Sequence, residues 1–177
     1  KVIVPSQHSK NGFAEALFEK IEVINFPARN LRQKKTDFEF STEFNFLSVA
    51  QLSPRKNVEQ TIQSFVEEFQ NEEVGLVLKL SVKSGSHIDR EYVKERLETL
   101  LATLPQERKC KIHLLHGTLS DEEMVSLYKN KNISAYVSTS HGEGYGLPVF
   151  EAAQHGVPVV TTNWGGIRDF SADKVVE

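Results

Sequence analysis

The feature that most constrains the fold of this chain is a regular alternation, from residue 44 onward, of short apolar runs with longer helical patterns. Several of the short runs are apolar at successive positions, which is typical of β-strands covered on both faces. The strand candidates are 44–50, 74–80, 111–116, 133–138 and 157–161. The alternation predicts an α/β fold, with an open parallel sheet flanked by helices.

Apolar residues three and four positions apart predict the helices that connect these strands. We expect every residue of these two patterns in the core: Val58, Ile62, Phe65, Val66 and Phe69, then Tyr92, Val93, Leu97, Leu100, Leu101 and Leu104. Ser120 and Glu123 have the spacing of a capping box, which predicts a helix start. Pro148 suits the first turn of a further helix, and Gly156 ends it.

The composition excludes several classes of protein. The 177 residues are 39% hydrophobic and 25% charged, enough for one sizeable core but short for two domains of usual size. A net charge of -3 gives no basic excess and argues against a nucleic-acid partner. The single Cys110 excludes an internal disulfide, and no zinc-ligand spacing occurs, so we expect no structural zinc site. No apolar run approaches the roughly 20 residues of a membrane helix, which fits a cytoplasmic location.

The first forty residues follow another pattern. We expect a strand at 2–4, a helix at 13–20 and a strand at 22–25. The polar stretch 29–36 is interpreted as a solvated linker. Its four basic residues leave open a peripheral contact with acidic lipid or with a partner.

The segment 138–152, STSHGEGYGLPVFEA, follows a predicted strand and opens a helix. Ligands of open α/β sheets bind beyond the carboxyl ends of the strands, where this segment lies. Gly142, Gly144 and Gly146 allow positive φ angles and a close approach of ligand to backbone. The helix start offers unpaired N–H groups and a positive dipole end, so we expect a phosphate here. Glycine turns are also used for geometry alone, and this signal is weak by itself.

Two carboxylates make the segment more specific. Glu143 lies in the glycine loop, and Glu151, eight positions later, is expected in the first turn of the helix. A carboxylate only accepts hydrogen bonds, so the pair suits the vicinal hydroxyls of a sugar or a ribose. Taken singly, each residue has an alternative explanation at least as good as ligand binding. Glu143 could be a solvated acid of the loop, and Glu151 could be a partner of the helix dipole. An acid pair also permits a hydrolase, but the intervening glycines favour phosphate binding.

The run from Glu143 to Glu151, continued by His155-Gly156-Val157-Pro158, closely resembles the donor-site motif of retaining glycosyltransferases of family 4, also called group 1. The segment 46–57 is similar to the family's strand-loop-helix that presents an arginine and a lysine to the donor diphosphate. Lys56 matches the lysine. The arginine position is occupied by uncharged Gln51, so the second cation would have to come from Arg55 or Lys79.

The resemblance implies a role for each matched residue. Glu143 and Lys56 would be catalytic, with Glu143 orienting the donor sugar and Lys56 stabilising the leaving diphosphate. Glu151 would hold the ribose. The donor would be bound by Gln51, Arg55, Lys56, Lys79, Gly117, Gly144, Tyr145, Gly146, Leu147 and Glu151. His116 and Thr118, beside Gly117, are candidates to border the base, and Trp164 would line an acceptor path or cap the core.

The family's members have two facing Rossmann-like domains, together called GT-B, and transfer a sugar from a nucleotide-diphosphate sugar with retention of configuration and without an essential metal. We expect 43–177 to be a C-terminally truncated donor-binding domain, 26–42 a linker and 1–25 a remnant of the acceptor-side domain. The acceptor would be a glycan, lipid or small molecule held by an absent N-terminal domain, and the fragment alone would be inactive. A binding module without catalysis and an interaction domain with a vestigial site remain alternatives.

Overall fold

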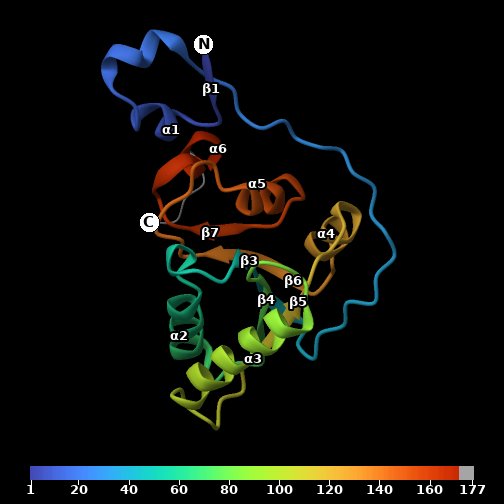
Figure 1. Cartoon of the computed structure of the whole chain (residues 1–177). Coiled ribbons are helices and arrows are strands. Elements are labelled where there is room, and N and C mark those ends of the chain that lie inside the picture. The colour runs from blue at the N-terminus through green and yellow to red at the C-terminus, as the bar shows by residue number, and fades with distance from the viewer. Residues whose placement is uncertain (172–177) are drawn as a thin grey trace.

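The computed structural model describes residues 1–171 and is built around one parallel sheet (Figure 1). Its strands are β3 (Phe44–Gln51), β4 (Val74–Ser81), β5 (Lys111–His116), β6 (Ile133–Ser138) and β7 (Val159–Thr161). They lie in the order β5-β4-β3-β6-β7, and every neighbouring pair is parallel. The predicted open parallel sheet is confirmed. The last strand starts later than expected, just after Pro158, which has no N–H to donate to the ladder.

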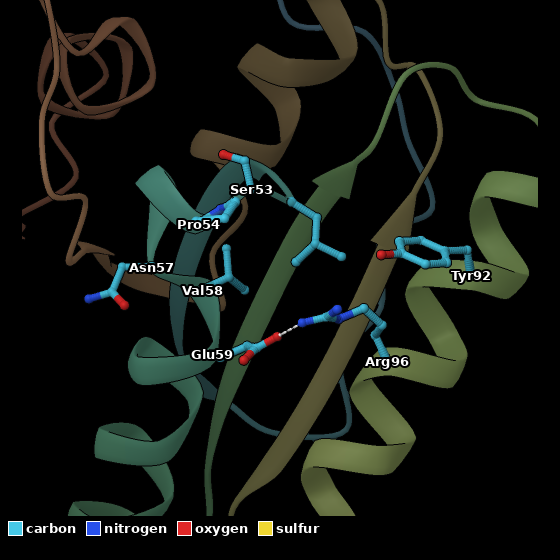
Figure 2. Close-up of a pocket in the computed structure, with 8 residues that line it drawn as sticks. Ser53, Pro54, Asn57, Val58, Glu59, Tyr92 and Arg96 are labelled. Carbon is cyan, nitrogen blue, oxygen red and sulfur yellow. Dashed lines mark hydrogen bonds and ion pairs between the residues drawn. The ribbon is translucent and has the colours of Figure 1, made fainter.

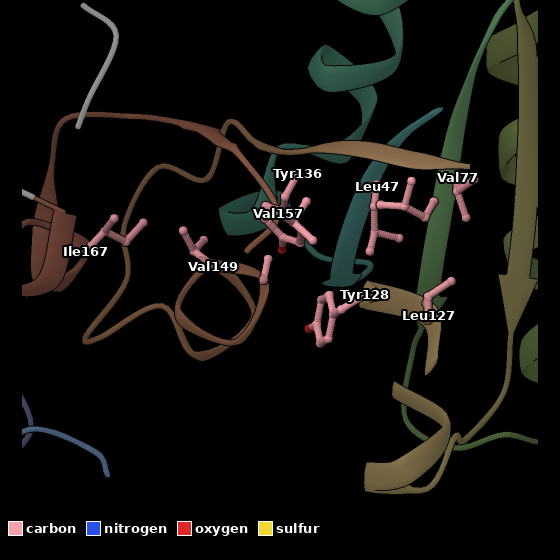
Figure 3. Packing of buried hydrophobic residues seen from close by; sticks show 10 residues of the cluster. Leu47, Val77, Leu127, Tyr128, Tyr136, Val149, Val157 and Ile167 are labelled. Atoms are coloured by element: carbon pink, nitrogen blue, oxygen red, sulfur yellow. The ribbon is translucent and has the colours of Figure 1, made fainter. Parts of the chain in front are cut away.

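Helices cover both faces of the sheet. The first is covered by α2 (Val58–Phe69) and α3 (His87–Ala102), and the second by α4 (Asp121–Tyr128) and α5 (Leu147–Gln154). Side chains alternate along β4, so Leu76 and Leu78 belong to the first cluster and Val77 to the second. Figure 3 shows the second cluster: Leu47, Val77, Leu127, Tyr128, Ile133, Tyr136, Val149, Ala152, Val157 and Ile167.

The strand order reverses at β3. Its successor in the chain, β4, lies on one side of it, and β6 lies on the other. The connections therefore diverge at the carboxyl ends of β3 and β6. Open α/β sheets bind their ligands at such a switch point. The fold thus directs attention to the loops after β3 and β6.

The N-terminal segment forms a small separate sheet, in which β1 (Val2–Val4) pairs in parallel with β2 (Ile21–Val23). Between them lie α1 (Gln7–Asn11) and the 3-10 helix η1 (Glu15–Lys20). The predicted helix at 13–20 is therefore wrong in type and start. The helix α1 was not predicted because its residues are all polar and carry no apolar period. Its start is instead fixed by the Ser6 hydroxyl, which accepts a hydrogen bond from the N–H of Ser9.

Residues 24–40 form no helix or strand and run along α4 (Figure 1). The N–H of Lys34 donates to Ser126 Oγ at 3.0 Å, and its ammonium lies 2.8 Å from Glu123 Oε1. Asn130 Nδ2 donates to the Phe38 carbonyl at 3.0 Å. Most of the segment is exposed, as in a solvated linker, but α4 and Asn130 supply partners for parts of its backbone. The proposed domain boundaries stay predictions, and 172–177 lie outside the described residues.

One predicted core residue is exposed. Tyr92 of α3 has 48% of its surface accessible, whereas Val93 and Leu97 on the same helix are buried. The helical period placed Tyr92 next to the apolar face, but a tyrosine can leave its ring at the edge of such a face and its hydroxyl in water. Among the described residues, none of the helices combines the length and apolarity needed to span a bilayer.

Candidate donor site

Two loops meet at the switch point and bind each other through their backbones. The first contains the short 3-10 helix η2 (Pro54–Lys56) after β3, and the second connects β6 to α5. The N–H of His141 donates to the Arg55 carbonyl at 2.9 Å, and the Arg55 guanidinium donates to the Gly142 carbonyl at 2.6 Å. Asn57 Nδ2 donates to the Thr139 carbonyl at 3.2 Å. The two loops therefore form one structural unit.

This unit holds a cluster of three charged side chains, which we call the cation cluster: Arg55, Lys56 and Glu143. The Lys56 ammonium lies 2.5 Å from Glu143 Oε1, and the Arg55 guanidinium lies 3.2 Å from Oε2. The side chains of Lys56 and Glu143 are only 12% and 11% exposed, whereas that of Arg55 is 54% exposed. Two positive charges face one negative charge, so the cluster carries a surplus positive charge that suits an anionic ligand.

The carboxyl group of Glu143 is held in its charged form. Burial is the largest single influence and would raise its pKa, but the hydrogen bond and the charge of Lys56 oppose burial. Ser140 and Arg55 act in the same direction, so the pKa of Glu143 lies below its ordinary value. Glu143 is thus an acceptor, and not an acid, at neutral pH.

The glycine loop reaches α5 through Gly146, which has a φ angle of +90°. A Cβ atom there would lie 2.6 Å from Ile167 Cγ1, so both backbone and space require glycine. Gly142 and Gly144 do not have positive φ angles, which corrects our expectation for them. Among the hydrogen bonds of residues 1–171, none is donated by the N–H of Gly144 or Tyr145.

Glu151 lies in different surroundings from Glu143. It is in the second turn of α5, because the helix starts at Leu147 and has no acidic residue in its first turn. The Tyr128 hydroxyl donates to its Oε2 at 3.1 Å, and the Arg29 guanidinium lies 3.5 Å from its Oε1. Burial and the nearby carboxylate raise the pKa of Tyr128, so its hydroxyl keeps the proton that it donates. The prediction of Glu151 in the first turn is therefore wrong, and the alternative role of a helix-dipole partner loses its basis.

The remaining predicted residues have other partners. The Gln51 amide donates to the Val82 carbonyl at 2.5 Å, and Lys79 Nζ donates to the Gly117 carbonyl at 2.5 Å. Lys79 is 8% exposed, and burial lowers its pKa. The structure therefore brings Arg55 and Lys56 to Glu143, and it directs Gln51 and Lys79 to the loops that follow β4 and β5. Tyr145 is buried, whereas Leu147 is exposed.

The comparison with protein families shows which family the chain belongs to. The family description "Glycosyl transferases group 1" matches residues 30–176, which include the whole sheet and both loops of the switch point. The chain belongs to the group 1 glycosyltransferases.

Curated relatives of this glycosyltransferase chain include the serotype-specific mannosyltransferase WbdA of Escherichia coli. One such protein is 28% identical over 151 residues, and another is 36% identical over 132 residues. The matched regions cover 85% and 75% of this chain but only 17% and 14% of the relatives. The chain therefore spans about one sixth of the length of the curated relatives it matches.

Several solved structures share the fold. The lipopolysaccharide outer core galactosyltransferase WaaB in its apo form has a TM-score of 0.59 at 18% identity, over 94% of this chain and 44% of that one. TarM has a TM-score of 0.59 at 18% identity, over 99% and 33%. A trehalose-6-phosphate protein from E. coli, bound with UDP-2-fluoro glucose, has a TM-score of 0.57 at 12% identity, over 76% and 33%. The expected GT-B, Rossmann-like architecture is confirmed.

In this member of the family, Gly165 and Gly166 form a glycine pair after β7. The pair directly supports the loop that carries Glu143. The N–H of Gly166 donates to the Glu143 carbonyl at 2.8 Å. A Cβ atom on Gly166 would lie 2.0 Å from the Gly144 carbonyl oxygen, so any side chain there would push the loop away. The pair is therefore needed for packing behind Glu143.

Sequence reasoning missed the hydrogen bonds that the N-terminal segment makes to Gly144 and to Asp169. The hydroxyl of Ser6, a fully buried residue, donates to the Gly144 carbonyl at 2.5 Å, and the Ser9 hydroxyl donates to the same oxygen at 3.2 Å. The N–H of Gln7 donates to Asp169 Oδ2 at 2.7 Å. Nothing in the local pattern marks these serines, because their partners lie more than a hundred residues away.

A pocket of about 360 Å³ lies on the helix-covered side of the η2 loop, between α2 and α3 (Figure 2). Glu59 of α2 and Arg96 of α3 form an ion pair across it. Ser53, Pro54 and Asn57 close its upper end. The pocket thus borders the loop that carries the cation cluster, but its charges are already paired with each other.

Proposed function

We propose that this chain is the donor-binding part of a retaining glycosyltransferase, which transfers a sugar from a nucleotide-diphosphate sugar to an acceptor hydroxyl. The observation that carries the proposal is the cation cluster at the switch point of the sheet, where Arg55 and Lys56 meet Glu143. An anionic ligand and a hydroxyl-bearing ligand would be recognised there by adjacent groups.

Lys56 and Arg55 would stabilise the diphosphate as it leaves. Charge develops on the departing phosphate oxygens in the transition state, and cations fixed by a folded framework are effective because they need no reorganisation. Lys56 is held by Glu143 and nearly buried, so it is the better fixed of the two. The free N–H groups of Gly144 and Tyr145, and the α5 start at Gly146 and Leu147, would add neutral donors to the same phosphate.

Glu143 would orient the donor sugar. A carboxylate has about four acceptor positions, and Lys56 and Arg55 use one on each oxygen. The remaining positions would accept hydrogen bonds from sugar hydroxyls and so fix the anomeric carbon. Because Glu143 is held ionised by Lys56, it would not act as a general acid. The acceptor oxygen would attack the anomeric carbon from the face that the diphosphate leaves, so the configuration would be retained. The departing phosphate oxygen would take the proton of the acceptor hydroxyl, so no protein base would be needed.

Glu151 would accept hydrogen bonds from the ribose hydroxyls through Oε1, while the Tyr128 hydroxyl donates to its Oε2. Gln51, Lys79 and Gly117 would lie toward the base, because their bonds order the loops after β4 and β5. We propose that no metal or other cofactor takes part, since Arg55 and Lys56 supply the positive charge.

The relatives support the donor class and the polysaccharide context. WbdA is named a mannosyltransferase, and the trehalose-6-phosphate protein is described as bound with UDP-2-fluoro glucose. We propose a nucleotide sugar as donor and a glycan as acceptor, with the acceptor held mainly by a separate domain. The fragment alone would bind the donor but transfer little.

Calorimetric titration with UDP, GDP and their sugars tests this function. The Lys56→Ala variant should lose at least about tenfold in affinity for both nucleotide and nucleotide sugar, equal to about 1.4 kcal/mol. Glu143→Gln should lower only the affinity for the nucleotide sugar. Lys94→Ala, which removes an exposed lysine of α3, is the matched control. Unchanged binding in Lys56→Ala, or no binding by the wild-type chain, would contradict the proposal.

One observation favours a second candidate, a nucleotide-sugar-binding module without catalysis. Gln51 occupies the position of the family arginine, and its amide is bound to the Val82 carbonyl instead of the cation cluster. When rejoined to an acceptor-side domain, such a module would still bind the nucleotide sugar but would not transfer it. Transfer gained only after Gln51→Arg would favour this candidate.

A further inference from the structure

The carbonyl group of Gly144, in the middle of the glycine loop, is held by two other segments of the chain. The Ser6 hydroxyl donates to its oxygen at 2.5 Å, and the Ser9 hydroxyl donates at 3.2 Å. The backbone of Gly166 packs against the same oxygen, because a Cβ atom there would lie only 2.0 Å from it. The two serines and Gly166 therefore fix the direction of this carbonyl group.

The serines are themselves fixed in place. Ser6 is fully buried, and its hydroxyl also accepts a hydrogen bond from the N–H of Ser9 at 3.0 Å. A buried hydroxyl with both a donor and an acceptor contact has a defined orientation, because losing either bond is costly. The N–H of Gln7 donates to Asp169 at the start of α6 (Arg168–Ser171). The helix α1 is thus docked on the sheet domain on both sides of the glycine loop contact.

A fixed carbonyl group also fixes the N–H group of the next residue. The peptide bonds of the described residues are trans, so the C=O and the N–H of each peptide unit point in opposite directions. The N–H of Tyr145 shares a peptide unit with the Gly144 carbonyl, and it therefore points away from Ser6 and Ser9. Glycine at 144 has no Cβ to restrict the rotation of this unit, so the serine contacts are needed to hold it.

The preceding peptide unit has a similar arrangement. The Glu143 carbonyl accepts a hydrogen bond from the N–H of Gly166 at 2.8 Å, so the N–H of Gly144 points away from Gly166. The Glu143 side chain meanwhile lies with Lys56 in the cation cluster. Two successive N–H groups, of Gly144 and Tyr145, thus face away from the wall that holds the loop. Such successive backbone N–H groups are suited to binding an anion.

We infer that Ser6 and Ser9 are positioning residues of the donor site. By holding the Gly144 carbonyl, they turn the N–H group of Tyr145 toward the donor phosphates. The inference rests on the proposed function for the identity of this ligand. Donors that are fixed before the ligand arrives need little reorganisation on binding. Both serines lie outside residues 30–176, which the family description matches, so the donor site depends on a segment upstream of the matched domain.

The amide signal of Tyr145 tests the inference by NMR. Tyrosine labelled at its backbone nitrogen gives four amide groups in this chain, and Tyr145→Phe assigns the relevant one. Inorganic diphosphate should shift the Tyr145 signal of the wild-type chain more than that of Tyr92 on α3. In Ser6→Ala this shift should shrink at saturation, and the dissociation constant for diphosphate should rise about fivefold, the scale of one neutral hydrogen bond.

Three further variants separate positioning from a purely structural role. Ser9 is partly exposed, so Ser9→Ala keeps the test available if Ser6→Ala does not fold. Ser9→Ala should weaken diphosphate binding less than Ser6→Ala, and Ser9→Thr, which keeps the hydroxyl, should bind like the wild-type chain. The matched control is Asp169→Ala, which removes the Gln7 contact of α1 without touching the glycine loop carbonyl. It should not weaken diphosphate binding.

The outcomes distinguish this inference from the proposed function. An unchanged diphosphate affinity or an unchanged Tyr145 shift in Ser6→Ala would overturn the positioning role and leave the donor site intact. Equal weakening in Asp169→Ala would also overturn it, because α1 would then act only through its docking. If the wild-type chain binds neither diphosphate nor UDP or GDP, both the inference and the proposed function are wrong.

Discussion

Glu143 and Glu151 are eight positions apart in the chain, but the structure places them in contrasting regions. Glu143 lies in a cluster made entirely by two loops of the sheet, with its side chain 11% exposed and two cations on it. Glu151 lies on α5 with its side chain 30% exposed, and its partners are a buried tyrosine of α4 and an arginine of the extended segment 24–40.

The difference shows which part of the donor site the sheet builds by itself. The two loops at the switch point supply the charged partners of Glu143, and Ser6 and Ser9 of the N-terminal segment contact only the carbonyl of the neighbouring Gly144. The surroundings of Glu151 depend in part on Arg29, an exposed residue upstream of β3. We therefore expect substitutions around Glu143 to affect stability and phosphate binding strongly. Those around Glu151 should act mainly on recognition of the nucleoside.

The largest effect is expected from separating Lys56 and Glu143. Removal of one member of a nearly buried ion pair takes the closest partner from the other charge, which costs about 3 kcal/mol. Without Glu143, Lys56 loses its carboxylate, and without Lys56, Glu143 keeps only the exposed Arg55. Lys56→Met and Glu143→Gln should each lower the free energy of unfolding by about this amount, measured with urea. The double variant should lose less than the sum, because neither charge is then stranded.

The matched control for this cycle is Arg55→Met. Its side chain is 54% exposed, so its ion pair with Glu143 should contribute only up to about 1 kcal/mol. Additive losses in the Lys56 and Glu143 variants would show that the two side chains do not depend on each other.

The same pair gives a pH dependence. The pKa of Glu143 lies below the ordinary glutamate value of about 4.3. The stability that it contributes is therefore fully present above about pH 4.3 and is lost as pH falls through the lower folded-state pKa. The difference in unfolding free energy between wild type and Glu143→Gln should be constant from about pH 7 to 5 and shrink in more acidic solution. A constant difference down to about pH 2 would contradict this assignment.

A smaller effect is expected at Tyr128. Its hydroxyl donates to the Glu151 carboxylate, and hydrogen bonds to charged groups contribute about 1.5 kcal/mol or more. Tyr128→Phe should lose about this much stability and should weaken binding of UDP or GDP but not of inorganic diphosphate. The control is Tyr136→Phe, which removes a buried hydroxyl bound to the neutral Val49 carbonyl. Equal weakening of diphosphate binding would place Glu151 at the phosphates instead of the ribose.

Much of the fold could be predicted from the sequence, because its signals are local. The apolar strand runs, the capping box at Ser120 and the glycine stop at Gly156 all act within a few residues, and the structure shows all three. The motif around Glu143 likewise identified the loop that meets Lys56.

The rest depends on partners that are distant in the chain. The serine contacts of Gly144 and the Arg29 contact of Glu151 span more than a hundred residues each. Tyr128 is buried, as its position in a helical pattern of apolar residues predicts. That pattern does not reveal that its hydroxyl donates to the Glu151 carboxylate. Loop residues such as Gly142 also have their φ angles set by contacts with the neighbouring loop, which a glycine count does not reveal.

The smallest effect is expected at Arg29, where the two regions differ most. Its guanidinium lies 2.6 Å from Asp121 and 3.5 Å from Glu151, and its side chain is 53% exposed. Exposed ion pairs contribute little, so Arg29→Ala should leave the urea midpoint unchanged within error. It should also free Glu151 Oε1, so binding of UDP or GDP should tighten slightly at low salt and match wild type at high salt, where the charge of Arg29 is screened. The control is Lys34→Ala, which removes another basic side chain of the segment 24–40, one that is paired with Glu123 of α4. It should change neither the urea midpoint nor the affinity for UDP or GDP. A clear loss of stability in Arg29→Ala but not in Lys34→Ala would contradict this prediction. It would show that the segment 24–40 belongs to the folded core. Glu151 would then be held as firmly as Glu143.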